Sequence, residues 1–356
     1  MNIDIIAEKI SRRERIDATE AKLLWEKAPL WLLARLATEA KRCASGDKVF
    51  YNRNYHVEPT NICRFACRVC SYRRHKGEEG AWEFSLEEIL SQVEARCGSG
   101  ATEVHIVGGV HPDRDLDYYL EMIARIKAIE PNICVKAFTA VELHYMITRA
   151  GLSLREGLLR LKEAGMESIP GGGAEIFDAE IRNQICPEKC SAEEWLALHE
   201  EAHRLGIDSN ATMLYGHIEN IDHRIDHLMR LRELQDRTGG INAFIPLKFR
   251  SANNAMESIG ETSVVDDMRT LAMSRIILDN VPHIKAYWVM YGKEVAEMAL
   301  QFGADDIDGT IDDSTKIYSM AGAADVRPRL TIAEIEKMCS VAGYQAVERD
   351  THYNEI

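Results

Sequence analysis

The sequence predicts an α/β fold, a TIM-type (β/α)8 barrel, from three observations. Eight short β-rich runs alternate with segments of helical periodicity along the chain. Strands that alternate with helices build parallel sheets, and a length of 356 residues suits a barrel of eight such units. Glycine-rich and polar motifs follow several of the runs, where barrel enzymes carry their active sites. A doubly wound open sheet is the alternative, but no GxGxxG turn follows the first run.

The eight predicted strands are rich in β-branched and aromatic residues. They are expected at residues 49–58, 102–109, 133–139, 166–172, 207–214, 242–249, 283–289 and 304–310. Between them, apolar residues recur at helical spacing, most clearly at 86–97, 116–129, 191–206 and 265–280. Ser85 and Glu88 are expected to form a capping box at the start of the first of these helices.

The barrel is expected to occupy residues 49–329. Residues 1–48 predict helices outside it, and residues 330–356 predict a closing helix over 330–346 followed by a tail that packs on the barrel. No low-complexity linker or charge block separates these parts of the sequence, so a single globular unit is expected.

The overall charge argues against two classes of partner. The formal net charge is -14, whereas nucleic acid and anionic membranes reward basic patches. We therefore expect a small-molecule substrate and neither of those partners. The first residues, MNIDIIAEKISRRERIDATEA, lack the apolar core of a signal peptide, and no run approaches the roughly 18 apolar residues of a membrane span. A cytoplasmic location is expected.

The stretch TNICRFACRVCSYRR, residues 60–74, carries the strongest chemical signal. Its cysteines Cys63, Cys67 and Cys70 have the spacing CxxxCxxC, and such a group of thiols in a reducing compartment indicates metal binding. A structural zinc site needs a fourth ligand, and none stands at a usual spacing. Three cysteines on three irons of a cubane cluster leave one iron open to another molecule. A scaffold that binds zinc or a cluster without enzymatic activity is the alternative.

This motif resembles the signature of the radical S-adenosylmethionine (SAM) enzymes, which have CxxxCxxC just after the first barrel strand. The resemblance implies a 4Fe-4S cluster on Cys63, Cys67 and Cys70, the catalytic cysteines, with SAM on the open iron. It also implies that the reduced cluster splits SAM into methionine and a 5′-deoxyadenosyl radical. The electron would come from a donor such as flavodoxin or ferredoxin. Val69 stands before the last cysteine, where the family commonly has an aromatic residue.

Other strand ends match positions at which radical SAM enzymes bind SAM. Gly108 and Gly109 end the second strand, where glycine lets the backbone approach a ligand closely. Glu175 follows three consecutive glycines at the fourth strand and is the only charge in that motif. Asn210 and Met213 end the fifth strand, where the family packs the adenosyl group. The resemblance implies that these five residues bind the cofactor.

Beyond the cysteines, the resemblance becomes specific to the aminofutalosine synthase family of menaquinone biosynthesis. It rests on IPGGGAEIF (169–177), SNATMLYGHIE (209–219), HIKAYW (283–288), DDIDGT (305–310) and ERDTHYN (348–354). One segment differs, because the family has FIPLxFxPxN where this chain has FIPLKFRSANN (244–254). The resemblance implies addition of the radical to the enolpyruvyl double bond of 3-[(1-carboxyvinyl)oxy]benzoate. Rearrangement and decarboxylation would then give aminodeoxyfutalosine, with release of methionine.

A substrate with two carboxylates needs cationic or hydrogen-bonding side chains around it. Four residues at or beside late strand ends are expected to bind it: His217, Arg250, His283 and Lys285. The alternative within the same superfamily is a dehypoxanthine futalosine cyclase, which shares the cluster and the barrel. Such an enzyme abstracts a hydrogen atom instead of adding the radical.

Overall fold

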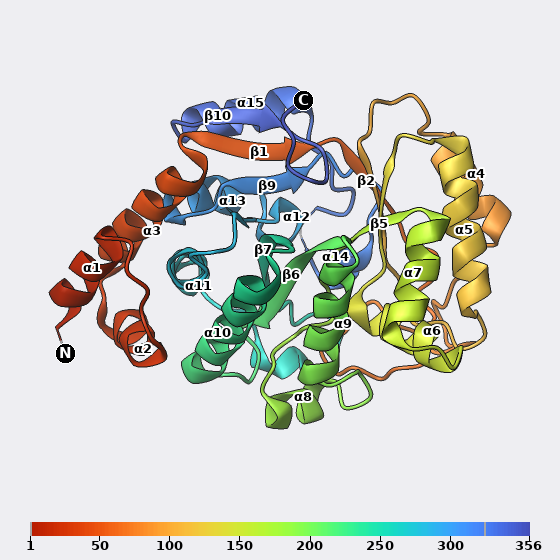
Figure 1. Cartoon of the computed structure of the whole chain (residues 1–356), viewed down its shortest axis with the longest axis horizontal. Helices are drawn as coiled ribbons and strands as arrows, with labels where there is room; N and C mark the ends of the chain where they lie inside the picture. Colours follow the sequence, from red (N-terminus) through yellow and green to blue (C-terminus); the bar gives the residue numbers. More distant parts are fainter. Residues whose placement is uncertain (1, 324) are drawn as a thin grey trace.

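Seven parallel strands form a curled sheet at the centre of the molecule (Figure 1). The computed structural model describes residues 2–323 and 325–356. The strands are β2 (Asn54–Val57), β3 (Glu103–Ile106), β4 (Cys134–Ala137), β5 (Met166–Ile169), β6 (Asp208–Tyr215), β7 (Ile241–Lys248) and β8 (His283–Ile284). They lie side by side in sequence order. Because all pairs are parallel, every strand ends at the same edge, and the segments that follow the strands gather there.

A second, three-stranded sheet joins the two edges of this sheet. Strand β9 (Asp306–Gly309) contacts β8 through a parallel bridge between Lys285 and Asp306, and it also pairs with β1 (Lys48–Asn52). Strand β1 leads into β2 after a single residue, Arg53, so β9 stands between the last and the first strand of the barrel. Each of the eight predicted runs contains a strand, although residues 49–58 divide into β1 and β2 and only the first two residues of 283–289 form a strand. The predicted fold is thus confirmed, as a partial barrel.

Helices surround the curled sheet and cover its outer face (Figure 1). They are α4 (Leu86–Glu94), α5 (Leu116–Ile129), α6 (Ala140–Arg149), α7 (Leu154–Ala164), α8 (Ala179–Ile185), α9 (Ala192–Arg204), α10 (Ile221–Thr238), α11 (Val264–Ile277), α12 (Trp288–Tyr291) and α13 (Lys293–Ala299), with short 3-10 turns at Glu257–Ile259 and Leu300–Phe302. The short helix α14 (Ile317–Met320) instead lines the cavity inside the barrel. The four helices expected from the sequence are among those outside the sheet. The predicted capping box is present, because the Ser85 hydroxyl accepts from the Glu88 N–H and the Glu88 carboxylate accepts from the Ser85 N–H.

Both ends of the chain pack on the barrel from outside. Three helices precede the first strand: α1 (Ile3–Ser11), α2 (Ala18–Lys27) and α3 (Leu30–Ser45). Of these, α3 packs against α11 and α2 against α10. At the other end, the closing helix is α15 (Ile332–Val341), so the helix predicted over 330–346 is wrong in its last part. Gly343, at a φ of 82°, follows the helix, and β10 (Gln345–Glu348) then pairs with the free edge of β1.

The two faces of the curled sheet differ in chemistry. Side chains alternate along a strand, and those facing the helices are apolar and fully buried, as Val104, Ile106 and Val135 show. The intervening positions His105 and Lys136 face the inside of the barrel. The interior is therefore polar although it is enclosed, which is the arrangement of a binding site and not of a plain core.

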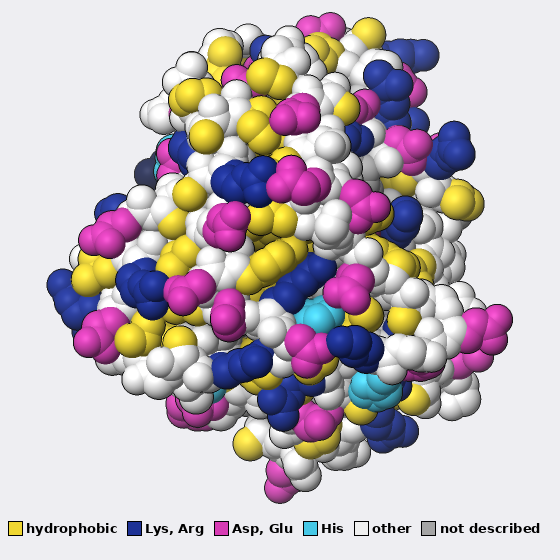
Figure 2. Space-filling model, turned by 90° about the vertical axis from the view of Figure 1, so that its right-hand side faces the viewer, with side chains coloured by type: hydrophobic (Ala, Val, Ile, Leu, Met, Phe, Trp, Pro, Cys, Tyr) yellow, Lys and Arg dark blue, Asp and Glu magenta, His cyan; other side chains and the backbone are white. Residues whose placement is uncertain are grey.

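The exterior carries charges of both signs (Figure 2). None of the described helices combines the length and the apolar character needed to cross a bilayer. Figure 2 shows Lys and Arg side chains interspersed with Asp and Glu over the right-hand face of Figure 1. This mixture of signs differs from the basic patches to which nucleic acids bind.

Candidate active site

The cysteine loop begins at the carboxyl end of β2, the edge at which barrel enzymes carry their sites. Two backbone bridges hold its ends, one between Thr60 and Glu83 and the other between Ile62 and Arg74. The N–H of Cys63 donates to the carbonyl of Arg74 at 2.8 Å, so the chain turns back on itself. This return closes the loop that carries the three predicted ligands.

The three thiols of this loop fit an iron–sulfur cluster. Backbone N–H groups donate to two of the sulfurs, from Val110 to Cys63 Sγ and from Arg73 to Cys70 Sγ, each at 3.4 Å. Such bonds to sulfur are a feature of cluster sites. Among the described residues, no three His, Cys, Asp or Glu side chains converge as ligands of a single ion. Three thiols in one loop, two of which accept backbone N–H groups, could hold the irons of a cluster, and this ligand set stays a prediction.

Gly108 and Gly109 pack directly against the cysteine loop. The Gly109 N–H donates to the Thr60 carbonyl at 2.8 Å, and a Cβ at Gly109 would lie 2.3 Å from the Ile62 carbonyl oxygen. The Gly108 N–H donates to Glu142 Oε1 at 3.1 Å. Burial raises the pKa of Glu142 to about 7, although it accepts these hydrogen bonds. The two glycines are thus needed for the close approach of β3 to the loop, and their contact with a cofactor stays a prediction.

Glu175 forms an ion pair with Lys189 close to the buried thiol of Cys67. Burial opposes the ionisation of Glu175, but the Lys189 ammonium keeps the pKa of this carboxyl below its ordinary value. Burial also raises the pKa of the Cys67 thiol to about 12. Coordination to iron deprotonates a thiol, so a bound cluster would reverse this effect of burial.

Asn210 and Met213 lie on opposite faces of β6. Asn210 and Thr212 line the inside of the barrel, whereas Met213 is fully buried in the apolar core. The prediction that Met213 contacts the cofactor is therefore not supported, because the alternation of the strand turns its side chain toward the helices.

A cavity of about 240 Å³ extends from the cysteine loop into the barrel. Cys70 lines it at the loop, together with Gly108 and Gly172. Three tyrosines form part of its wall: Tyr72, Tyr287 and Tyr318. The rings of Tyr287 and Tyr318 meet edge to face, with centroids 5.2 Å apart. The wall is thus aromatic close to the predicted cluster.

Six polar side chains form the part of the cavity that we call the floor: His56, Glu103, His105, Lys136, Lys285 and Asp308. Lys136 Nζ lies 2.7 Å from Glu103 Oε2, and Lys285 pairs with Asp308. The rings of His56 and His105 lie with centroids 4.4 Å apart. Burial lowers the pKa of His56 to about 4 and that of His105 well below its ordinary value, so both imidazoles are neutral at pH 7.

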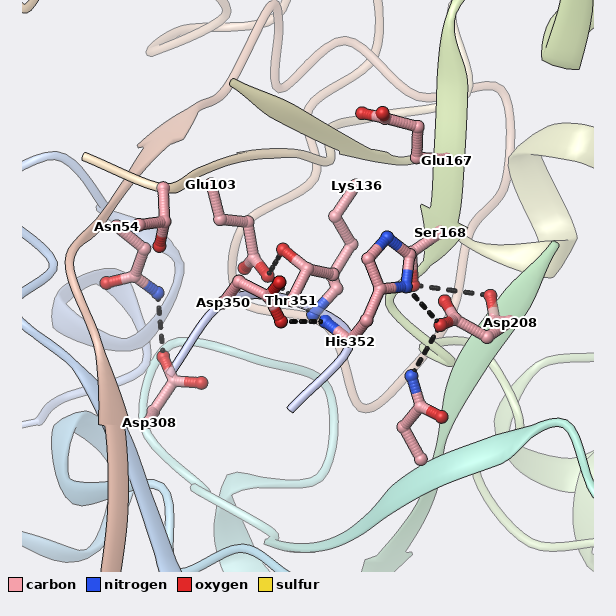
Figure 3. A network of polar contacts seen from close by, with 12 residues as sticks. Asn54, Glu103, Lys136, Glu167, Ser168, Asp208, Asp308, Asp350, Thr351 and His352 are labelled. Atoms are coloured by element: carbon pink, nitrogen blue, oxygen red, sulfur yellow. Dashed lines mark hydrogen bonds and ion pairs between the residues drawn. The ribbon is translucent and has the colours of Figure 1, made fainter. Parts of the chain in front are cut away.

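The C-terminal tail contacts the strands that bear this floor. Figure 3 shows Thr351 beside Glu103 and His352 beside Asp208. The Thr351 hydroxyl donates to Glu103 Oε2 at 2.8 Å. Arg349 is fully buried and pairs with Asp306 Oδ2 at 2.6 Å. The tail therefore holds carboxylates at the base of the barrel.

Of the four residues predicted to bind substrate, Lys285 is the one that lines the cavity. His283 does not line this cavity, because it opens β8 at the amino end of the strand. Its ring stacks on Tyr353 of the tail, with centroids 3.8 Å apart, and its Nδ1 lies 3.0 Å from Asp305 Oδ2. The sequence of a predicted strand does not show where the strand begins and ends, so it does not show that His283 lies at the amino end.

His217 and Arg250 are engaged by other protein groups. His217 Nδ1 lies 3.1 Å from Glu219 Oε2, and its Nε2 lies 3.1 Å from the Leu214 carbonyl oxygen. Arg250 pairs with Glu261 at 3.0 Å. Neither residue lines the cavity, so their predicted roles in substrate binding are not supported. Nearby carboxylates take the positions that a substrate carboxylate would need.

Sequence reasoning missed four of the floor residues, His56, Glu103, His105 and Lys136. The strand register places His56 opposite His105 and His105 opposite Lys136, so these three lie at one level of the barrel. Buried parallel strands are typically apolar on both faces. A polar residue at the inward position of each successive strand is the signal that would have found them.

Two family models match successive parts of the chain. The family model of the radical SAM superfamily matches residues 57–231, and that of the CofH/MqnC C-terminal region matches residues 238–356. Over 355 residues the chain is 42% identical to the aminodeoxyfutalosine synthase of Thermus thermophilus, covering 99% of this chain and 95% of that protein. The chain belongs to the radical SAM superfamily. Radical SAM enzymes use a 4Fe-4S cluster and SAM, which confirms both predicted cofactors, and the non-enzymatic scaffold is wrong.

Of two further relatives of this radical SAM enzyme, one has the same name and the other a different one. It is 39% identical over 358 residues to the aminodeoxyfutalosine synthase of Streptomyces coelicolor, covering 98% of this chain and 92% of that protein. It is 38% identical over 344 residues to 5-amino-6-(D-ribitylamino)uracil–L-tyrosine 4-hydroxyphenyl transferase 2 of Methanosarcina mazei, covering 95% of this chain and 88% of that protein.

Solved structures share the fold of this radical SAM enzyme at low sequence identity. Methylornithine synthase superposes with a TM-score of 0.76 at 15% identity, covering 96% of this chain and 97% of that chain. The FeFe-hydrogenase maturase HydG from Carboxydothermus hydrogenoformans superposes with a TM-score of 0.75 at 19% identity, covering 99% of this chain and 80% of that chain. These matches confirm the partial barrel.

Proposed function

We propose that this radical SAM enzyme is an aminodeoxyfutalosine synthase. The observation that carries the proposal is the 42% identity to such a synthase over almost the whole length of both chains. In the proposed reaction, the 5′-deoxyadenosyl group of SAM joins the enolpyruvyl carbon of 3-[(1-carboxyvinyl)oxy]benzoate, called the enolpyruvyl benzoate below. The aryl group migrates, one carboxyl group leaves as bicarbonate or carbon dioxide, and methionine is released.

The cysteine loop and the barrel divide the work of this reaction. Cys63, Cys67 and Cys70 would hold the cluster, and SAM would occupy the iron that they leave open. When bound, these groups supply the 5′-deoxyadenosyl radical. The barrel surrounds the cavity and the tail packs at its base, so a substrate bound there would be shielded from water.

The lining of the cavity supports an aromatic dianion as substrate. Tyr72, Tyr287 and Tyr318 offer flat surfaces against which a benzoate ring can pack. Lys136 and Lys285 lie on the floor as N–H donors, each already paired with a carboxylate, of Glu103 and Asp308 respectively. An aromatic wall near the cluster and hydrogen-bond donors farther in would hold the benzoate carboxylate away from the cluster and leave the enolpyruvyl double bond facing it.

The segment that differs from the family motif contacts the cysteine loop. The Ser71 hydroxyl donates to the Ala252 carbonyl at 2.7 Å, and Asn254 Nδ2 donates to the Ser71 hydroxyl at 3.2 Å. Residues 250–254 are absent from the lining of the cavity. The difference from the family motif therefore affects residues that contact the cysteine loop, and it does not change the proposed substrate.

A second candidate function has an observation in its favour. The chain is 38% identical to the Methanosarcina mazei transferase, which is named for 5-amino-6-(D-ribitylamino)uracil and L-tyrosine. The identity to this transferase is lower than the identity to either synthase, and the match spans a smaller share of the transferase than of either synthase. We therefore rank this activity second.

An anaerobic assay with the reconstituted enzyme, SAM and dithionite distinguishes the candidates. Separate reactions receive the enolpyruvyl benzoate, L-tyrosine with 5-amino-6-(D-ribitylamino)uracil, or dehypoxanthine futalosine, and mass spectrometry identifies the products. We expect an adenosyl–benzoate product, with an equal amount of methionine, in the first reaction alone. Conversion in the second or third reaction without product in the first would refute the synthase.

The location and the electron donor are part of the same proposal. All nine cysteines are free thiols, which is typical of a reducing cytoplasm. Flavodoxin or ferredoxin would reduce the cluster. Arg64 and Arg68 are exposed on either side of Cys67, and this local positive charge would attract an acidic electron carrier to an otherwise acidic enzyme.

A further inference from the structure

The floor of the cavity contains two imidazoles without an evident partner. Both ring nitrogens of His56 are buried and have no hydrogen-bond partner among the described residues, and the residue is 5% exposed. His105 packs against it from the neighbouring strand, at the same level of the barrel. Leaving a buried polar group unpaired is costly, so the His56 ring, with the ring of His105 beside it in the cavity wall, points to a ligand.

Charged groups from several strands face the two rings. They are Glu103 from β3, Lys136 from β4, Lys285 directly after β8 and Asp308 from β9. They combine into two ion pairs, Lys136 with Glu103 and Lys285 with Asp308, so their charges cancel. The tyrosines that line the cavity are raised in pKa by burial and stay neutral.

A carboxylate that enters this floor adds a net negative charge to a buried site. Burying an unpaired charge is strongly unfavourable, and both lysines are already neutralised by their partners. Imidazole is the group of the floor that gains a proton most easily near neutral pH. A carboxylate beside His56 would oppose the effect of burial and raise the pKa of the ring. Two rings this close repel each other when both are charged, so the pair has room for one added proton.

We propose that His56 and His105 form a carboxylate-binding subsite that takes up one proton from solvent when the anionic end of the substrate binds. The charged ring donates a hydrogen bond to the carboxylate, and the second ring shares the proton. This inference rests on the proposed function for the identity of the dianion. It adds the residues that bind the carboxylate and the proton that accompanies binding.

Isothermal titration calorimetry measures this proton directly. The cluster-loaded enzyme is titrated with the enolpyruvyl benzoate, without SAM or reductant, at one pH in phosphate and in Tris, whose ionisation enthalpies differ. We expect uptake of about one proton per ligand, and an affinity that falls about tenfold per pH unit above the pKa of the liganded pair. Benzene-1,3-dicarboxylate is a second dianion, and its dimethyl ester is the neutral control.

The double variant His56→Gln/His105→Gln assigns the proton to the two rings. We expect it to abolish the uptake and to lower the affinity about 10- to 100-fold, the range for a lost hydrogen bond to a charged group. His144→Gln is the matched control, because His144 lies on α6, outside the cavity, 3.6 Å from Glu194. The wild-type titrations test the uptake even where the double variant does not fold.

Three results would overturn the proposal: heats that do not depend on the buffer, uptake that persists in the folded double variant, or failure of both dianions to bind. Turnover of the enolpyruvyl benzoate by the same preparation tests the proposed function separately. If benzene-1,3-dicarboxylate binds with proton uptake while the enolpyruvyl benzoate is not converted, the subsite stands and the synthase is refuted.

Discussion

Replacing Arg349 with methionine tests how the C-terminal tail is held on the barrel. Arg349 is fully buried, and its guanidinium lies 2.6 and 2.8 Å from Asp306 Oδ2. Methionine keeps an apolar stem but leaves the Asp306 carboxylate buried without this partner. Removal of one member of a buried ion pair costs about 3–5 kcal/mol. The hydroxyl of Tyr353 also donates to Asp306, at 2.8 Å, so we expect the lower end, ~3 kcal/mol.

Thermal unfolding followed by circular dichroism measures this loss. At about 2.1 cal/mol/K per residue, a chain of 356 residues has an unfolding entropy of about 0.75 kcal/mol/K. A loss of ~3 kcal/mol then lowers Tm by about 4 °C. Arg327→Met is the control, because Arg327 is 84% exposed and lies 3.9 Å from Asp313, and it should shift Tm by less than about 1 °C. A shift for Arg349→Met no larger than the control would refute the reasoning about the buried pair.

Three further predictions concern the cysteine loop and its neighbours. Cys67→Ala should abolish the brown colour of the reconstituted enzyme and lower its iron content, whereas Cys43→Ala, at an exposed thiol on α3, should preserve both. Gly109→Ala should also lower the iron content, because its Cβ would lie 2.3 Å from the Ile62 carbonyl oxygen, and full loading of the folded variant would contradict this. Burial raises the pKa of Glu142 from 4.5 to about 7, so the folded chain binds this proton more tightly than the unfolded chain. The free energy of unfolding of the cluster-free protein should therefore fall as pH rises through this window, and Glu142→Gln should remove that dependence in urea titrations. An equal slope in the variant would show that other groups cause it.

The fold was largely predictable because its information is local and repetitive. Strand and helix periods alternate along the chain, and parallel strands with helical crossovers leave few topologies to choose from. Strand β10 (Gln345–Glu348) escaped prediction, since it is stabilised by pairing with β1, which lies near the other end of the sequence. A short run whose partner is so distant has little signal of its own.

In the candidate site too, the residues defined by local spacing were predictable and those defined by distant strand pairing were not. Cys63, Cys67 and Cys70 lie within eight residues, and their spacing alone indicates the chemistry. The floor depends instead on register, because His56 faces the cavity through its pairing with β3, whereas His283 opens its strand at the far end. Which polar residue of a strand faces the cavity follows from the strand register in the partial barrel and not from the strand sequence.

The central claim is that this enzyme adds the 5′-deoxyadenosyl group to its substrate. A single turnover with the enolpyruvyl benzoate and SAM labelled with carbon-13 at the 5′ carbon tests it most directly, with the products identified by NMR and mass spectrometry. We predict that the label enters a new carbon–carbon bond to the benzoate skeleton, with an equal amount of methionine and without labelled 5′-deoxyadenosine. Recovery of all the label in 5′-deoxyadenosine would contradict the claim and would indicate hydrogen abstraction.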